Sequence, residues 1–220
     1  MMESVAELLG SLGKALFETF EMVSISTVAA VLLGLPLGLL LFITSQGLFF
    51  ESKLINKAGG LAVNMIRSIP FVILLVLVLP LTDLLVGSTI GPLAASFPLS
   101  IAAIAFFGRL AEGAFREIDK GVIEAAVASG AKPWLIIWEV LLIEALPSLI
   151  NALTITVISL IGYSAMAGIV GGGGVGDLAI RFGYYRYQTG VMLITVAVLV
   201  LLVQGTQGLG DLFSRKLDRR

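Results

Sequence analysis

Long stretches without any charged residue are the feature that most constrains this chain. Between Met22 and Phe50 there are 29 consecutive residues without Asp, Glu, Lys or Arg, and further uncharged runs cover 84–108 and 145–176. A helix needs about 20 mainly apolar residues to cross the hydrocarbon core of a bilayer. Only 13% of the residues are charged, against about 25% in soluble domains. The sequence therefore predicts an all-α membrane protein.

Charges and helix-breaking residues delimit five predicted spanning helices within one membrane domain over 1–220. We expect these helices at about 19–43, 58–80, 93–113, 145–170 and 189–210. Pro36 falls inside the first, and proline is tolerated where neighbouring groups satisfy the freed backbone atoms. The N-terminal region carries Glu3 and Glu7 rather than a basic segment, so we expect no cleaved signal peptide.

The distribution of basic residues predicts the orientation of these helices. If the N-terminus lies outside, eleven basic residues fall in cytoplasmic segments and three in outer segments. The eleven are Lys53, Lys57, Arg67, Arg109, Arg116, Lys120, Lys132, Arg215, Lys216, Arg219 and Arg220; the three are Lys14, Arg181 and Arg186. Cytoplasmic loops carry the excess of Lys and Arg. The predicted topology is N-out and C-in, with the loop at about 117–143 in the cytoplasm between the third and fourth spans.

This cytoplasmic loop has the pattern of two short helices joined by a tight bend. Glu124, Ala125 and Ala126 belong to the first predicted helix, which ends at Gly130 because glycine accepts the left-handed conformation found after helix ends. Pro133 suits the first turn of the second helix. The small alanines permit close approach of another surface, and Glu124 offers a carboxylate to it. An ordinary loop between two spans is the alternative.

Trp134 and Trp138 lie four residues apart, on one face of the second predicted helix. They could lie at the membrane interface, where tryptophan is enriched, or contact a docked partner.

The residue content argues against an enzyme. Cysteine and histidine are both absent, which excludes disulfides, the usual zinc sites and Ser-His-Asp or Cys-His catalysis. We interpret Glu112, Glu117, Asp119 and Glu124 as charges of a solvated loop rather than an acid/base pair. The formal net charge of −1 offers no basic footprint for nucleic acid.

One glycine run has the form of a nucleotide-binding motif. The run Gly171–Gly176 has the form G-x-G-x-x-G, but it follows an apolar span rather than a strand. A flexible helix end is the better interpretation. The chain has no G-x-x-x-x-G-K-[ST] motif, so any ATP must be hydrolysed by another chain.

Four residues are candidates for lining a polar path through the membrane. Tyr163, Ser164 and Met166 lie in the fourth predicted span, where ordinary helix packing is the alternative role. Arg67 is either a functional intramembrane charge or an anchor that reaches the interface. Outside the spans, the aromatic run Tyr184–Tyr187 could contact a partner or form an interfacial belt.

The cytoplasmic loop resembles the EAA loop of ABC-importer permeases. The resemblance is carried by Glu124-Ala125-Ala126, Gly130 and Leu146-Pro147. In that family the loop forms a coupling helix held in a groove of a separate ATPase subunit. The family usually has Leu-Pro about a dozen residues after the glycine. Here Leu142-Ile143 stands at that position, which could alter a bend but keeps the helix–Gly–helix design.

Further runs resemble the methionine-import permeases in particular. They are Arg67-Ser68-Ile69-Pro70-Phe71, Gly162–Gly168, Gly171–Asp177 and Gly183–Gln188. The resemblance covers most of the chain from about residue 20 onward. It implies a homodimeric pathway subunit with two ABC ATPase subunits, which hold ATP and Mg²⁺, so that no cofactor is expected in this chain.

The same resemblance implies a methionine-binding lipoprotein outside the cell and a location in the bacterial cytoplasmic (inner) membrane. Methionine is then the expected cargo. Another amino acid or a small peptide is an alternative cargo for an ABC permease. An ion-coupled secondary transporter is a different class; it would need coupling-ion sites and usually an internal repeat, and neither is evident.

Overall fold

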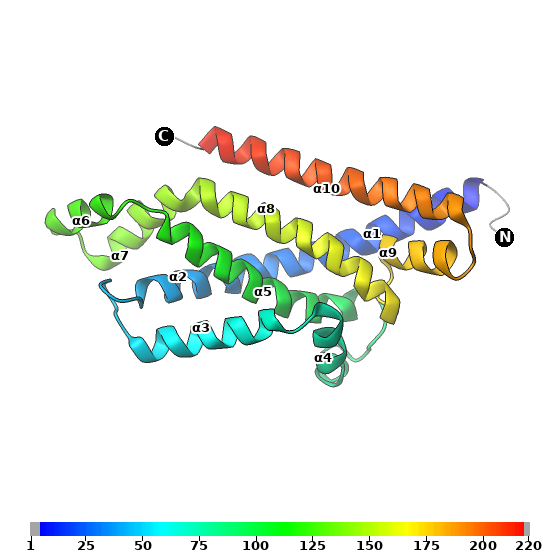
Figure 1. Ribbon diagram of the computed structural model, residues 1–220, viewed down its shortest axis with the longest axis horizontal. Helices are drawn as coiled ribbons and strands as arrows, with labels where there is room; N and C mark the ends of the chain where they lie inside the picture. Colours follow the sequence, from blue (N-terminus) through cyan, green and yellow to red (C-terminus); the bar gives the residue numbers. More distant parts are fainter. Residues whose placement is uncertain (1–4, 218–220) are drawn as a thin grey trace.

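The structure, a computed structural model, describes residues 5–217, and every regular element in this range is helical. The all-α expectation is confirmed. Four helical segments are long and apolar enough to span a membrane: Gly10–Ile43, Pro92–Arg116, Pro133–Val170 and Thr189–Leu217. A fifth span results if Lys53–Ser68 and Phe71–Leu77 are counted together. The described chain is thus an elongated bundle of four or five spans (Figure 1).

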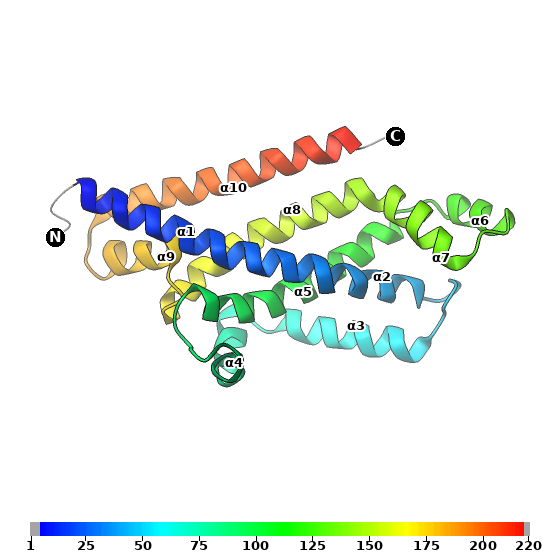
Figure 2. The same cartoon turned by 180° about the vertical axis from the view of Figure 1, so that it is seen from behind.

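The long helices run lengthwise along this bundle, with α5 (Pro92–Arg116) at its centre, whereas α4 (Phe71–Val86) lies across it (Figure 1). One face is covered by α1 (Val5–Ala29), η1 (Ala30–Gly34) and α2 (Leu35–Ile43), which together form one rod (Figure 2). The other face is covered by α8 (Leu142–Ala167), with α10 (Thr189–Leu217) beyond it. A cluster of buried residues from α1, α4, α5 and α8 forms the main core; it includes Met22, Phe71, Leu99, Phe107 and Leu160.

The expected single helix at 58–80 is instead two helices. These are α3 (Lys53–Ser68) and α4 (Phe71–Val86), and they meet at 103°. Ile69 is extended, with φ −84° and ψ 124°. The residue before a proline is sterically driven out of the helical region, and Pro70 itself has no N–H to continue the helix. The single helix expected through Pro70 is therefore broken there, and the bent pair together makes the candidate span.

Pro36, by contrast, lies within a continuous rod. The turn before it, η1, is a widened π-turn, in which the N–H of Leu35 donates to the carbonyl of Ala30. A proline cannot donate to the carbonyl four residues earlier, and a wider turn is one way for a helix to absorb that loss. The rod therefore continues to Ile43, and it begins well before residue 19, where the first span was expected to start.

Glycines allow α2 and α5 to touch backbone to backbone. A Cβ atom on Gly38 would lie 2.5 Å from the carbonyl oxygen of Gly108, and one on Gly34 would lie 3.0 Å from that of Ile104. Small residues at such positions are how spanning helices pack closely. The contact fixes the α1–α2 rod against the central helix.

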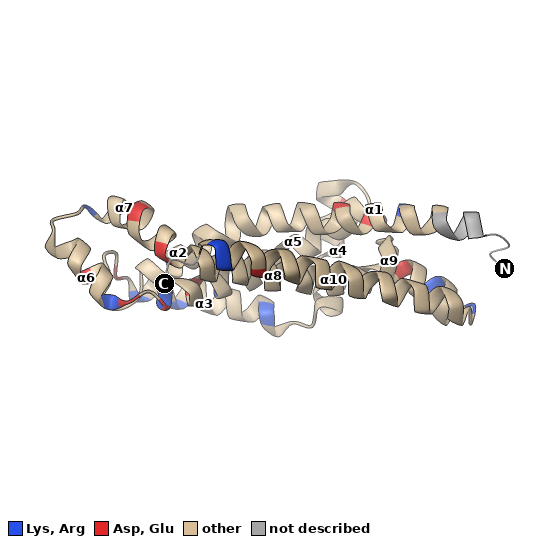
Figure 3. Ribbon diagram, turned by 90° about the horizontal axis from the view of Figure 1, so that it is seen from above, with Lys and Arg blue, Asp and Glu red and all other residues tan. Residues whose placement is uncertain are grey.

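The two ends of the bundle differ. One end carries the α2–α3 loop and the helices α6 (Lys120–Ala128) and α7 (Pro133–Ile136), which continues through η2 (Ile137–Leu141) into α8. The other end carries the start of α1, η3 (Gly168–Val170), α9 (Gly174–Leu178) and η4 (Ala179–Tyr184). Figure 3 shows charged residues mostly toward these two ends. The middle of the bundle between these ends is mainly apolar.

Candidate functional site

The helices α6 and α7 form an elbow that projects from one end of the bundle (Figure 1). Asp119 caps α6 by accepting a hydrogen bond from the N–H of Gly121 at 2.6 Å. At the bend, Gly130 has φ +79°, and the N–H of Ala131 donates to the carbonyl of Ala126 at 3.2 Å. That pairing satisfies a helix-end carbonyl and needs the left-handed backbone that glycine adopts readily. Pro133 then opens α7.

The elbow is anchored on one side and free on the other. Ile123 is buried in a cluster with Phe115, Ile136 and Leu141, which fixes α6 to the end of the bundle. On its outward side Glu124 and Ala125 are exposed, and Ala126 is partly buried. A short helix with a carboxylate and small side chains is thus available to another surface.

The two tryptophans of the elbow pack against each other and remain exposed. The rings of Trp134 and Trp138 are 5.5 Å apart in an edge-to-face arrangement. Both side chains are more than half exposed. Such a pair adds a large apolar surface beside the α6 helix.

A cavity of about 120 Å³ brings together two of the four predicted pathway residues. Arg67 and Tyr163 both line it. The ring of Tyr163 stacks on Phe71 with centroids 4.8 Å apart, and the guanidinium of Arg67 lies 5.8 Å from the ring centroid of Phe106. The cavity lies where α3 breaks into α4 against α5 and α8.

The other two predicted pathway residues lie elsewhere. Ser164 is buried and donates a hydrogen bond to the carbonyl of Ile161 at 2.8 Å within its own helix. Met166 is exposed on α8 and does not line this cavity. Ser164 directly follows Tyr163 on α8, so these two side chains point in different directions.

Glu112 is not the solvated loop charge that was expected. It lies within α5, is 3% exposed, and pairs with Arg109 at 2.6 Å and with Arg116 at 2.7 Å. The three residues are spaced i, i+3 and i, i+4 on one helical face, which allows both pairs to form. The carboxylate therefore holds two half-exposed guanidinium groups in place.

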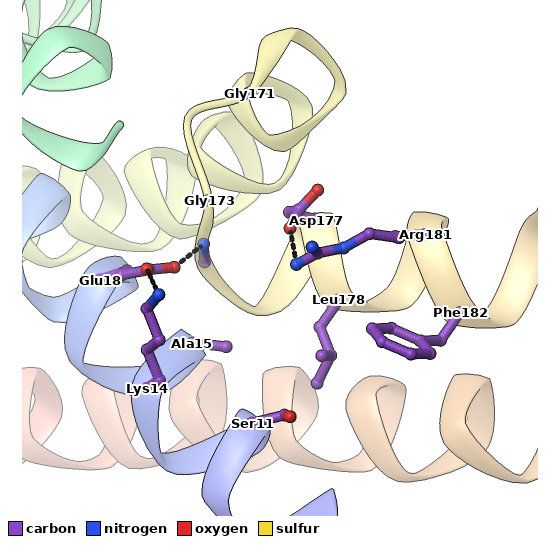
Figure 4. A pocket seen from close by; sticks show the side chains of 11 residues that line it. Ser11, Lys14, Ala15, Glu18, Gly171, Gly173, Asp177, Leu178, Arg181 and Phe182 are labelled. Carbon is purple, nitrogen blue, oxygen red and sulfur yellow. Dashed lines mark hydrogen bonds and ion pairs between the residues drawn. The ribbon is translucent and has the colours of Figure 1, made fainter. Parts of the chain in front are cut away.

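A polar pocket lies at the end of the molecule opposite the elbow, and the sequence analysis did not predict it. It has a volume of about 420 Å³ and is lined by Lys14, Glu18, Asp177 and Arg181, among others (Figure 4). Two ion pairs, Lys14 with Glu18 at 3.7 Å and Arg181 with Asp177 at 2.6 Å, form within its wall. The i, i+4 spacing of each pair was the available signal.

The glycine run, expected to be a flexible helix end, lies beside this pocket and is hydrogen-bonded to α1. Glu18 accepts a hydrogen bond from the N–H of Gly174 at 2.8 Å, and the hydroxyl of Thr19 accepts one from Val175 at 3.0 Å. Positive φ angles occur at Gly171, Gly173 and Gly174. The first residues of the run form a tight turn held by α1, and α9 begins within the run at Gly174.

Comparison with known proteins identifies relatives over nearly the whole chain. A family model described as "Binding-protein-dependent transport system inner membrane component" matches residues 30–219. The "Probable D-methionine transport system permease protein MetI" of Vibrio cholerae is 47% identical over 206 residues, which cover 94% of this chain and 92% of that protein. The "Methionine import system permease protein MetP" of Bacillus subtilis is 44% identical over 181 residues, 82% of each chain.

Two solved structures are similar to this chain over nearly its whole length. One described as "Inward facing conformations of the MetNI methionine ABC transporter: CY5 native crystal form" has a TM-score of 0.95 and 42% identity, covering 98% of this chain and all of that one. A second, "Crystal structure of an amino acid ABC transporter with histidines", has a TM-score of 0.80 at 20% identity and covers 98% of each chain. The second likeness concerns the fold alone.

Proposed function

Because the chain belongs to the family of binding-protein-dependent transport system inner membrane components, we propose that it forms the membrane pathway of an ATP-driven importer of methionine. In this proposal ATP is hydrolysed by separate ATPase subunits, which also hold Mg²⁺, and the chain itself is not an enzyme. The observation that carries the mechanism is the elbow. Its Glu124-Ala125-Ala126 helix projects from the bundle with Glu124 and Ala125 exposed.

The elbow suits a contact that transmits motion. Glu124, Ala125, Ala126 and Gly130 are the residues we assign to ATPase coupling. Closure of an ATPase pair on ATP would displace α6, and the buried Ile123 would pass that displacement to the end of α5 and to η2. The elbow's second helix, α7, continues through η2 and α8 as one helical segment, so a displacement of the elbow reaches the bundle directly.

The proposed topology is N-out and C-in, in a bacterial inner membrane. The elbow end carries Lys53, Lys57, Arg116, Lys120 and Lys132, whereas the opposite end carries Lys14, Arg181 and Arg186. Arg67 is not counted among the basic residues of the cytoplasmic end, because it lies 14 residues along α3 from Lys53. The remaining excess still supports the elbow end as the cytoplasmic one.

The proposed assembly has two copies of this chain, two ATPase subunits and an extracytoplasmic methionine-binding lipoprotein. The names of the relatives, which specify methionine transport and a MetNI transporter, support the cargo and the ATPase partners. Arg67 and Tyr163 are the pathway residues that the cavity at the α3–α4 break supports. Ser164 and Met166 are less suited to that cavity, because Ser164 is buried against its own helix and Met166 does not line the cavity.

The test is ATP-driven uptake of labelled methionine into proteoliposomes that contain the chain, its ATPase and the binding protein. We expect accumulation that requires ATP. Competition by unlabelled compounds tests the cargo: inhibition by another amino acid or a small peptide, but not by methionine, would move the cargo to that compound. Uptake by the chain alone on an ion gradient would instead establish a secondary transporter.

A further inference from the structure

Arg67 lies far from either end of the bundle. It is 14 residues along α3 from Lys53, a rise of about 21 Å. Its aromatic neighbour Phe106 lies near the middle of α5, 14 residues after Pro92 and 10 before Arg116. The guanidinium of Arg67 therefore lies alongside α5, one turn of that helix from Arg109, and it is exposed in the single chain.

No carboxylate partner compensates this charge among the side chains that the structure describes. The ion pairs found there involve Lys14, Arg109, Arg116 and Arg181, and none involves Arg67. Arginine does not lose its proton in proteins. An ionisable side chain inside a membrane faces a water-filled cavity or a counter-charge and marks substrate or ion pathways. Within the single described chain Arg67 is exposed and no carboxylate pairs with it, so its guanidinium is open to an anion.

The surroundings of Arg67 define what kind of anion fits. The cavity wall is otherwise apolar or aromatic: Ile66, Ile69, Phe71, Leu74, Ala102, Phe106 and Tyr163. The stacked rings of Phe71 and Tyr163 form one side of it, at the 103° break between α3 and α4. A guanidinium binds a carboxylate with two parallel hydrogen bonds. An apolar side chain on the same molecule would find aromatic and aliphatic contacts within reach.

We propose that Arg67 binds the α-carboxylate of the transported amino acid, and that the aromatic wall beside it receives the apolar side chain. This inference rests on the proposed function, because it assigns a residue to the recognition of that cargo within the membrane. A phosphate of an anionic lipid could satisfy the same guanidinium, so the test separates the two sources.

The test uses the assembled permease–ATPase complex in nanodiscs and a labelled photoreactive methionine analogue with a diazirine in its side chain. Incorporation of label is measured in this chain alone, after separation of the subunits. Arg67→Gln removes the charge. Lys57→Gln is the matched control, because Lys57 is an exposed cation of the same helix, ten residues earlier. We expect labelling to fall roughly tenfold or more in Arg67→Gln, the size expected for a charge-assisted hydrogen bond, and to stay unchanged in Lys57→Gln.

A ligand comparison needs no variant and therefore does not depend on whether Arg67→Gln assembles. Methionine should suppress labelling of the unmodified chain, whereas methioninol, which lacks the carboxylate, should suppress it far less. Equal competition by methioninol, or equal labelling of Arg67→Gln, would overturn the proposal. So would loss of a copurifying anionic phospholipid in Arg67→Gln with labelling unchanged, which would assign Arg67 to a lipid phosphate.

Uptake measured with the same unmodified protein separates this inference from the proposed function. If ATP drives methionine uptake and labelling is equal in the unmodified chain and in Arg67→Gln, the inference is rejected and the proposed function is retained. Labelling that depends on Arg67 without any methionine uptake keeps the carboxylate site and rejects methionine import.

Discussion

The carboxylate of Glu18 accepts a hydrogen bond from the backbone N–H of Gly174, 156 residues later in the chain, at 2.8 Å. The bond connects α1 to the turn that starts α9 (Figure 4). A negative charge at this position satisfies an N–H at a helix start and interacts favourably with the helix dipole. Helix α1 thereby fixes the position of the turn from which α9 begins.

Replacing Glu18 by alanine should destabilise the protein. We expect the free energy of unfolding to fall by about 1–2 kcal/mol, the usual effect of losing a capping side chain, and Glu18→Gln to lose less because its amide oxygen still accepts. Thermal unfolding of the detergent-solubilised protein gives the measurement. An unchanged melting temperature in Glu18→Ala would show that the cap contributes nothing.

Gly176→Ala should be severe. A Cβ atom at Gly176 would overlap the backbone of Ala165, which is not the movable end of a side chain. We therefore expect loss of the folded, assembled protein or a fall of several kcal/mol, as for other overpacked positions. Gly205→Ala is the control, since a Cβ atom there would meet nothing within 4 Å. Similar size-exclusion profiles and melting temperatures for both variants would contradict the packing at α8 and α9.

Glu112→Gln should lower stability by about 1–3 kcal/mol, because charged hydrogen bonds to Arg109 and Arg116 are lost from a buried carboxylate. Glu139→Gln, at an exposed position, should stay within about 0.5 kcal/mol of the unmodified protein. Melting temperatures of the two variants provide the comparison. An equal, small effect in both would mean that the two arginines do not depend on Glu112.

At the elbow, Gly130→Pro and Glu124→Lys should preserve membrane insertion and uncouple ATP hydrolysis from transport. Proline fixes φ near −65°, whereas Gly130 has φ +79°, and lysine reverses the charge on the exposed face of α6. The measurement is methionine uptake per ATP hydrolysed in proteoliposomes. Normal ratios in both variants would mean that the elbow is not the ATPase contact.

Gly130→Ala and Gly130→Asn provide a graded control for the backbone argument. Asparagine tolerates the left-handed conformation better than alanine, so the asparagine variant should retain more transport. The opposite order would point to the loss of space rather than backbone conformation as the cause.

The helical content of the fold could be predicted from the sequence because charges are scarce and mark the ends of apolar runs. The break at Ile69–Pro70 could not. Pro36 and Pro70 both lie in apolar stretches, yet one follows a widened turn and the other follows an extended residue. Helix propensity alone does not distinguish these outcomes, because packing against neighbouring helices decides which one is stable.

The elbow was predictable because its signals are local. Glycine at a left-handed position and proline in the next first turn depend on neighbours within a few residues. The contact of Glu18 with Gly174 and the meeting of Arg67 with Tyr163 join residues about 100 positions or more apart. Only the three-dimensional packing of the helices brings these residues together: α1 against α9 in the first case, and α3 against α8 in the second.

The continuity of α5 has a mechanical consequence. This helix runs from the turn at Gly91, whose N–H donates to the carbonyl of Gly171 at 2.9 Å, to the base of the elbow at Arg116, with Pro98 inside it. Its length is about 37 Å, and the backbone contact at Gly38 and Gly108 clamps it to α2. A push at the elbow end is therefore carried along α5 as far as Pro98, where the helix lacks one backbone hydrogen bond and bends most easily. Bending also falls at the Ile69–Pro70 break and at the glycine turn held by Glu18.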